Sequence, residues 1–460
     1  MRGEMSDEMI KIAELRDSER EAIQKIVSKV GTPVYIYFQE RMEEQIRRFG
    51  DAVEKFSSDV EVQCYFAMLA NHNPYLIRQI LQAMEDNGLS PGVLCASEGH
   101  LRILSRISSL PRRLNIIYSD AFLDESKLSQ FIHYLSSSEA YTLILILQTL
   151  QQTEIFTQKW PQIKEKMSEK FHVGVRIKLV GSSSKDIYSL YHGQNARFGL
   201  MRNNLQEALS KLKSCGISQV GFHIYPGTNI LYLSELESLY NGLLQTIQKI
   251  LTYNSGLELD FIDVGGGFGI NYQKREFLNP DKVIEILKNI FSPLSDKKER
   301  ILIEPGRTII GPAGVLIAKV VDIKDEGSRK FVVVDTGLSH FARPYIYRQY
   351  HQVQVIPQNE RRVKTNWDAD AFIVGITMAS GDFLAGDPLE DAPIKIERVE
   401  IGDLIAFLDV GAYGFCMSSN FSGLLKPPEV LVEGKNYYLV RERKEVGYLL
   451  AEVPLCLKSL

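Results

Sequence analysis

The chain has 460 residues, of which 45% are hydrophobic and 24% charged, a composition typical of a globular protein with two sizeable cores. Its formal net charge of −4 gives no general electrostatic attraction for nucleic acid or acidic membranes. Five scattered cysteines favour free thiols in a reducing compartment, so we expect a cytoplasmic protein. No run approaches the roughly 20 apolar residues that cross a bilayer, and the charged stretch 1–21 has no apolar core of signal-peptide length, so we expect no signal peptide there.

After a charged lead-in, the pattern predicts a strand over 32–36 and a helix over 40–49. Apolar strands and amphipathic helices then alternate. The predicted strands cover 62–68, 92–97, 114–119, 141–147, 172–179, 218–225, 258–264 and 300–304. The predicted helices among them cover 74–87, 98–107, 124–137, 203–214, 233–252 and 280–291.

This alternation favours a (β/α)8 barrel of the TIM type over an open doubly wound sheet, because candidate site residues follow several different strands. Beyond about residue 310 helical periodicity ends, and the pattern is typical of an all-β domain. We therefore expect an N-terminal segment over 1–35 that joins the β domain, a barrel over 36–310, and a C-terminal β domain over 311–460.

Three consecutive glycines, Gly265, Gly266 and Gly267, follow the predicted strand 258–264. Glycines let backbone N–H groups approach an anionic oxygen closely, as phosphate-binding loops require. A dinucleotide-binding fingerprint fits poorly, because the expected glycine spacing and following helix are missing. From this stretch alone, a phosphate-binding loop and a tight barrel turn are equally good interpretations.

A carboxylate and a guanidinium lie three residues apart in Glu304-Pro305-Gly306-Arg307, which ends the eighth predicted strand. This pair suits a ligand with one cationic and one anionic pole, since arginine forms strong charge-assisted bonds to phosphate. For the tetrapeptide in isolation, a surface ion pair is the better interpretation.

The stretch 65–71 reads Tyr-Phe-Ala-Met-Leu-Ala-Asn and ends the predicted strand 62–68. It resembles the Tyr/Phe-Ala-x-Lys-Ala-Asn signature of the pyridoxal-phosphate (PLP) decarboxylases of diaminopimelate, ornithine and arginine. In that family the lysine forms a Schiff base with PLP, and its position here is Leu69. The motifs match in order over about 32–445, most closely those of the diaminopimelate enzymes. The resemblance implies a PLP-binding barrel followed by a β domain.

The resemblance also implies cofactor contacts. Glu304 would pair with the pyridine nitrogen, and Tyr225 would stack on the ring in place of the usual histidine. The residues that would bind the phosphate are Thr228, Gly265, Gly266, Gly267, Arg307 and Tyr413. His223 lies on the same predicted strand as Tyr225, and we interpret it as a core histidine with satisfied hydrogen bonds.

Arg343 and Tyr347 keep the spacing of an arginine and a tyrosine that bind the distal carboxylate of the substrate in diaminopimelate-type enzymes. A substrate with a terminal carboxylate is therefore one interpretation. A buried Arg–Tyr pair with a structural role is an equally good one.

The segment 375–382 resembles a family loop, Gly-Pro-x-Cys-Glu/Asp-Ser/Gly-x-Asp, that reaches into the partner subunit's active site. The resemblance therefore implies a homodimer with shared active sites. The family's proton-donating cysteine is Met378 here, and the acid that binds the substrate amine is Ala379. Neither a leucine nor a thioether transfers protons, so acid–base work is lost at positions 69 and 378.

Three functional interpretations follow. The chain is a PLP-dependent α-decarboxylase of a basic or dicarboxylic amino acid whose lysine has been altered, or a natural relative that binds PLP or a PLP–amino acid adduct without a covalent bond. The third interpretation is a scaffold or regulatory partner without turnover. Losses at separate catalytic positions favour natural divergence, because one altered residue explains only Leu69. No spacing suggests a metal site.

Overall fold

The computed structural model describes residues 7–56, 60–111, 113–136, 142–167, 170–179, 197–294, 300–327, 329–358, 368–397 and 399–450. The chain divides into two compact units. Unit 1 comprises Met1–Ile10, Glu43–Ile270 and Glu276–Ile309, and unit 2 comprises Lys11–Met42, Asn271–Arg275 and Ile310–Leu460.

Unit 1 is built on one parallel sheet. Its strands are β3 (Glu61–Cys64), β4 (Phe66–Ala67), β5 (Gly92–Cys95), β6 (Asn115–Tyr118), β7 (Thr142–Leu147), β8 (Phe171–Arg176), β9 (Gln219–His223), β10 (Glu258–Asp263) and β13 (Arg300–Ile303). They pair in the order β3-β13-β10-β9-β8-β7-β6-β5-β4. Only Tyr65 separates β3 from β4, so the two edges of the sheet are consecutive in the chain, which closes a barrel of eight strand positions. The predicted (β/α)8 fold is confirmed.

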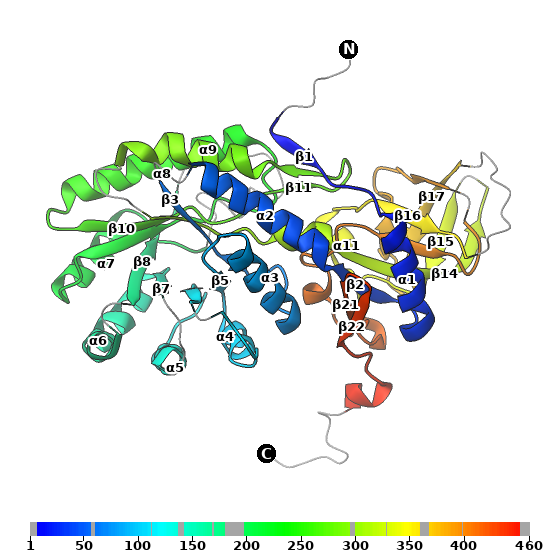
Figure 1. Ribbon diagram of the computed structural model, residues 1–460, viewed down its shortest axis with the longest axis horizontal. Coiled ribbons are helices and arrows are strands. Elements are labelled where there is room, and N and C mark those ends of the chain that lie inside the picture. Colours follow the sequence, from blue (N-terminus) through cyan, green and yellow to red (C-terminus); the bar gives the residue numbers. More distant parts are fainter. Residues whose placement is uncertain are drawn as a thin grey trace. The chain divides into compact units, whose positions relative to one another are not determined.

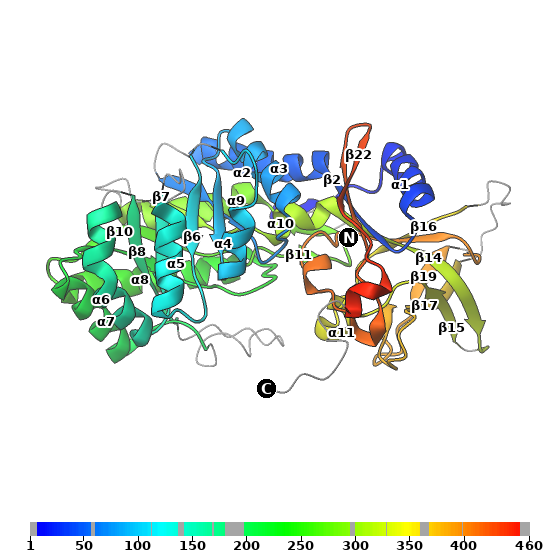
Figure 2. The same cartoon turned by 90° about the horizontal axis from the view of Figure 1, so that it is seen from below.

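Helices alternate with these strands and lie on the outer side of the sheet, as Figures 1 and 2 show for α4 to α7. They are α3 (Pro74–Asp86), α4 (Glu98–Leu104), α5 (Glu125–Ser136), α6 (Leu150–Met167), α7 (Arg202–Ser214), α8 (Leu233–Tyr253) and α9 (Pro280–Phe291). All six predicted helices are present. The prediction lacks α6, whose interior contains Pro161, a residue that usually breaks a helix.

The barrel interior is filled by side chains from different strands. The ring of Phe261, on β10, is fully buried there with Ile117, Ile144 and Leu302. A Cβ atom at Gly174, on β8, would lie 2.8 Å from the Phe261 ring, and one at Gly221, on β9, would overlap it. Glycine at these positions makes room for a large ring, so the barrel is a packed core and not a channel.

Unit 2 is a β-sheet domain. Its strands are β2 (Val34–Phe38), β14 (Gly314–Asp325), β15 (Lys330–Val334), β16 (Val353–Ile356), β17 (Asp368–Val374), β18 (Phe383–Ala385), β19 (Ile394–Glu397), β20 (Leu404–Phe407), β21 (Glu429–Glu433) and β22 (Asn436–Arg441). The main path runs β18-β17-β15-β14-β2-β21-β22, and β20 joins it by pairing with β14. The predicted C-terminal β domain is confirmed.

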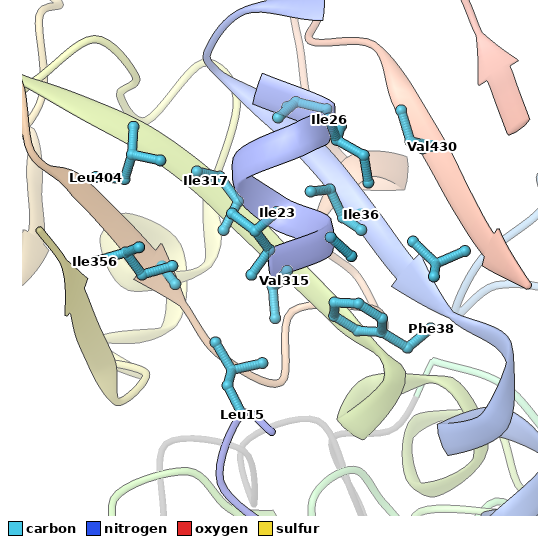
Figure 3. Packing of buried hydrophobic residues seen from close by; sticks show 14 of the residues in the cluster. Leu15, Ile23, Ile26, Ile36, Phe38, Val315, Ile317, Ile356, Leu404 and Val430 are labelled. Atoms are coloured by element: carbon cyan, nitrogen blue, oxygen red, sulfur yellow. The ribbon is translucent and has the colours of Figure 1, made fainter. Parts of the chain in front are cut away.

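Helix α1 (Asp17–Val30) covers part of this sheet, although the sequence prediction treats these residues as a charged lead-in. Its Ile23 and Ile26 pack with Ile36 of β2 and with Val315 and Ile317 of β14 (Figure 3). Many charged residues lie on its other faces, which hides the apolar stripe in the sequence.

The remaining elements are short or connect the two units. They are α2 (Gln39–Phe56), α10 (Arg307–Ile310), α11 (Arg343–Tyr347) and the strands β1 (Met9–Lys11), β11 (Ile270–Asn271) and β12 (Glu276–Leu278), which pair in the order β1-β12-β11. Among the described helices, none combines the length and apolar character needed to cross a membrane.

Candidate functional site

The candidate residues of unit 1 follow the carboxyl ends of its strands. Leu69 follows β4, Tyr225 and Thr228 follow β9, the three glycines follow β10, and Glu304 follows β13. Because these strands are parallel, their carboxyl ends meet at one edge of the barrel, here called the carboxyl edge. Active sites of barrel enzymes lie at this edge.

The turn formed by Gly265, Gly266 and Gly267, here called the glycine turn, packs its backbone directly against neighbouring segments. Gly265 and Gly267 have φ values of +71° and +87°, which favour glycine. A Cβ atom would lie 2.6 Å from the Ile224 carbonyl oxygen at Gly265 and 2.5 Å from that of Gly227 at Gly267. Among the described residues, no acceptor bonds the backbone amides of Gly266 and Gly267. The turn is therefore both tight and provided with donors for an anion.

Arg307 lies beside this turn and binds a hydroxyl group. Its Nη2 donates a hydrogen bond of 2.9 Å to Thr228 Oγ1, and the arginine is buried. A cation and a hydroxyl from two different strand ends thus meet at the carboxyl edge. This arrangement suits a phosphate, which accepts bonds from both groups.

Tyr225 is 44% exposed as a residue, so part of it is open to a ligand. The guanidinium of Arg176 lies 5.3 Å from the centre of the Tyr225 ring, and its Nη1 donates a bond of 3.0 Å to Gln148 Oε1. Sequence reasoning missed Arg176 as a candidate. Its only signal was a basic residue within a predicted strand that also contains His172 and Lys178.

Three buried titratable groups lie deeper at the same edge. A ring nitrogen of His223 and carboxylate oxygens of Asp263 and Glu304 lie within 4.8 Å of one another. His223 Nε2 lies 3.7 Å from Glu304 Oε1. Among the described residues, His223 Nδ1, Asp263 Oδ2 and Glu304 Oε1 have no hydrogen-bond partner. The interpretation of His223 as a core histidine with satisfied hydrogen bonds is therefore wrong.

Position 69 is a point on the carboxyl edge that packing leaves open. The Leu69 side chain is 45% exposed, in a turn where the Ala70 amide bonds the Ala67 carbonyl. A Cβ atom at Gly306 would lie 3.1 Å from Ala67 and 3.0 Å from Ala70, so this turn packs closely on the segment that precedes Arg307. The turn packs closely through its backbone, while Leu69 itself stays 45% exposed.

In unit 2, Arg343 is surrounded by tyrosine rings. Its guanidinium lies 5.1 Å from the Tyr272 ring centre, 5.7 Å from that of Tyr347 and 5.7 Å from that of Tyr413. It also bonds Gln349 Oε1, and only 1% of it is exposed. The structure thus brings together Arg343, Tyr347 and Tyr413. We call these three residues the arginine–tyrosine cluster.

The loop 375–382 is held by a buried carboxylate. Asp382 Oδ2 accepts bonds from the Thr377 amide (2.9 Å) and hydroxyl (2.6 Å), and its Oδ1 accepts one from the Leu338 amide (2.7 Å). Burial raises the pKa of Asp382 despite these bonds. Met378 is 97% exposed and Ala379 is half-buried. The loop therefore has a fixed base and an accessible tip.

Comparisons with known proteins agree on a family. The family model described as "Pyridoxal-dependent decarboxylase, C-terminal sheet domain" matches residues 34–411. Diaminopimelate decarboxylase of Aquifex aeolicus is 30% identical over 444 residues, which cover 93% of this chain and 93% of that protein. The enzyme of the same name from Archaeoglobus fulgidus is 29% identical over 442 residues, covering 93% and 94%.

Solved structures share the fold. The crystal structure of diaminopimelate decarboxylase from M. jannaschii gives a TM-score of 0.78 at 22% identity and covers 94% of each chain. That of the Helicobacter pylori enzyme complexed with L-lysine gives 0.75 at 21% identity, covering 93% of this chain and 98% of that one. The family model spans most of the described barrel and sheet domain, and the relatives match along nearly their whole length. The chain belongs to the pyridoxal-dependent decarboxylase family.

Proposed function

We propose that this chain binds PLP, the cofactor of its family, at the carboxyl edge of unit 1. The phosphate is bound by Arg307, Thr228 and the glycine turn, the ring lies against Tyr225, and Glu304 pairs with the pyridine nitrogen. The observation that supports this proposal most strongly is the buried Glu304 Oε1. It has no hydrogen-bond partner among the described residues, and it follows the same strand as the phosphate-binding arginine.

These residues fit the two poles of the ligand. Bound PLP supplies an electron-withdrawing pyridinium ring that takes up electrons released when a bond to the substrate Cα breaks. Glu304 keeps a proton on the ring nitrogen because its carboxylate stabilises the adjacent positive charge. Arg307 balances the phosphate charge and fixes its orientation through directed N–H donors.

The family's reaction is decarboxylation, and two of its reacting groups are absent here. We infer that PLP is bound without a covalent bond to residue 69, because leucine has no amine. Decarboxylation is slow for the same reason, and Met378 supplies no proton to speed it. The proposed activity is therefore PLP binding with little turnover.

The arginine–tyrosine cluster supports a proposal for the substrate class. A guanidinium among three tyrosine rings suits a carboxylate, which accepts charge-assisted bonds from arginine and from phenol hydroxyls. We propose that Arg343 and Tyr347 bind the distal carboxylate of a dicarboxylic amino acid. Diaminopimelate, the substrate in the relatives' names, has such a group.

A homodimer with shared sites is part of the proposal. Met378, Ile376, Tyr345 and Ile346 are exposed apolar residues in unit 2, on or close to the loop 375–382. Such a cluster on a soluble protein is typical of an interaction surface. Light scattering should give twice the mass of one chain, and Met378→Glu should shift the protein toward the monomer. A strictly monomeric wild-type protein would contradict this part.

Leu69→Lys tests the proposed function. Wild-type protein should bind PLP in a titration but lose it on dialysis after borohydride reduction, whereas the lysine variant should keep about one pyridoxyl group per chain. Leu69→Met, which preserves size and lacks an amine, is the matched control and should behave like the wild type. If neither the wild type nor the lysine variant binds PLP, the proposal fails.

Carbon dioxide release from diaminopimelate, ornithine, lysine and arginine then tests the chemistry. The lysine variant should exceed the wild type, and diaminopimelate should be the preferred substrate. Arg343→Ala should remove that preference if the cluster binds the distal carboxylate. Equal rates with all four amino acids would contradict the proposed substrate class.

A second candidate function is that of a regulatory partner for an active relative, favoured by the joint loss at positions 69, 378 and 379. This function predicts a mixed oligomer with a diaminopimelate decarboxylase and reduced activity of that enzyme. Native mass measurement on a mixture of the two proteins distinguishes it from the first proposal, which predicts only homodimers.

A further inference from the structure

The two carboxylates of the buried cluster come from neighbouring strands. Asp263 ends β10 and pairs in register with His223 of β9 and with Leu302 of β13, two residues before Glu304. The Glu304 amide donates a 2.9 Å bond to the Gly265 carbonyl, which fixes the segment after β13 against the turn after β10. The strand pairing itself therefore forces the two carboxylates together.

Hydrogen bonds satisfy this cluster only in part. Asp263 Oδ1 accepts the Gly265 amide at 2.9 Å, but Asp263 Oδ2 and Glu304 Oε1 have no partner among the described residues. Both side chains are almost fully buried. Two ionised carboxylates so close together, away from water, would repel each other strongly.

Among the described residues, the groups around the pair do not supply two positive charges. His223 faces Glu304 from β9, and burial lowers its pKa, which disfavours a positive charge on the ring. Tyr240 of α8 and Tyr65, between β3 and β4, are also buried, which raises the pKa of each phenol. Arg176 of β8 is the cation that interacts with both carboxylates. The positive charge of Arg176 balances one of the two carboxylates. The other carboxylate is then left without a balancing charge and can hold a proton.

We propose that Asp263 and Glu304 share one proton in the cofactor-free protein and release it when a pyridinium nitrogen pairs with Glu304. In this step a carboxyl O–H bond breaks, the proton passes to solvent, and the pyridinium replaces its positive charge. Asp263 is thus a positioning residue that sets the charge on Glu304. The release step rests on the proposed PLP binding, whereas the shared proton does not.

The shared proton gives stability a defined pH dependence. Burial and the neighbouring Glu304 raise the pKa of Asp263 well above its usual range. The native state therefore holds a proton that the unfolded chain releases above its ordinary carboxyl pKa of about 4. Since the native state binds more protons, stability falls as pH rises from there through the raised pKa of Asp263.

The first experiment uses cofactor-free protein treated with a chelator, so that no cation occupies the cluster. Asp263→Asn and Glu304→Gln each remove one proton site, and unfolding is measured from pH 5 to pH 8. Relative to the wild type, each variant should gain stability as pH rises, and the double variant should gain no more than either single one. Parallel pH profiles for the wild type and both single variants would overturn the shared proton.

Asp260→Asn is the matched control on the same strand. Asp260 is partly buried, but its ion pairs with His172 (2.6 Å) and Arg300 (2.6 Å) hold its pKa below the usual value. This variant should therefore lose stability by an amount that stays constant from pH 5 to pH 8, unlike Asp263→Asn, because a lowered carboxyl pKa changes stability only below about pH 4. A common trend in both variants would indicate a general effect of β10.

The second experiment measures protons released on PLP binding, by calorimetry in two buffers of different ionisation enthalpy. The wild type should release about one more proton per chain than Asp263→Asn, whatever the ionisation of free PLP, because only the wild type starts with the shared proton. Equal release would overturn the release step. If PLP binds to neither protein, the proposed function fails, while the pH profiles still decide whether the pair shares a proton.

Discussion

The carboxyl edge of unit 1 and the loop 375–382 of unit 2 tolerate change very differently. At the carboxyl edge, the glycine turn leaves no room for a Cβ atom, and Arg307 and Glu304 are buried. At the loop tip, Met378 is almost fully exposed, and Leu69 is the candidate position at the carboxyl edge that is exposed in part. The positions that would hold a cofactor are fixed by packing, whereas the positions that carry reacting groups in the family are not.

This difference allows the fold to persist when residues at the exposed positions are replaced. Replacing a lysine or a cysteine at an exposed position removes a reaction but little packing energy, since exposed substitutions usually change stability by less than about 0.5 kcal/mol. Replacing a buried, close-packed residue affects the whole domain. Reacting groups are therefore lost more easily than the scaffold that positions them.

The largest expected effect is that of Gly266→Ala. A Cβ atom there would overlap the Glu304 carbonyl oxygen, so we expect the free energy of unfolding to fall by roughly 3 kcal/mol. We expect the variant to lose PLP binding as well. Chemical denaturation measures the first effect and a PLP titration the second. Gly242→Ala, in α8 with open space around it, is the control and should stabilise the protein by about 0.5–1 kcal/mol. Equal changes in stability for Gly266→Ala and Gly242→Ala would contradict the view that packing fixes the carboxyl edge.

Asp382→Ala should come next, because it removes the base of the loop and not its tip. Three hydrogen bonds to Thr377 and Leu338 are lost, and we expect a cost of about 2–3 kcal/mol. Hydrogen exchange at 375–382 should become much faster. Unchanged exchange would mean that the loop is ordered without its buried carboxylate.

Arg307→Ala should weaken PLP binding about 30-fold, near 2 kcal/mol, because a charged donor at the carboxyl edge is lost. Arg307→Lys keeps the charge without the planar donors and should cost only about tenfold. Arg102→Ala is the control in unit 1, since its partner Glu98 lies on the same exposed helix face. Unaltered affinity in Arg307→Ala would place the phosphate elsewhere.

The smallest expected effects are those of substitutions at the two exposed positions, 69 and 378. Leu69→Lys and Met378→Cys should each change the free energy of unfolding by less than about 0.5 kcal/mol, because neither side chain is buried. Thermal unfolding of the cofactor-free variants tests this. A large loss of stability in either variant would show that packing does constrain positions 69 and 378.

The sequence predicted the barrel strands well because each is a short apolar run between polar segments. It did not predict α1, whose apolar stripe is hidden among charges, or α6, which contains Pro161. It also gave no sign that Asp263 lies against Glu304. That contact depends on how β10 and β13 pair, and strand register across a barrel is not written in local patterns.

Individual site residues show the same limit. The glycine turn was a recognisable local motif, and the structure supports both interpretations of it, since the turn is tight and still has amides without a bonded acceptor among the described residues. Arg176 escaped notice because a single arginine in a strand has no motif around it. Its contact with Tyr225 joins residues from two strands, which only the folded chain brings together.

The break at Tyr65 gives the barrel a seam. β3 pairs with β13 on one side of this residue and β4 pairs with β5 on the other, while the Tyr65 amide bonds the Ile303 carbonyl at 2.8 Å. The ring closes only if chain length across the seam is kept, because deleting one residue there would exchange inward and outward side chains beyond it. Position 69 lies four residues after Tyr65. The residue type at this position can therefore change, but its place at the carboxyl edge cannot.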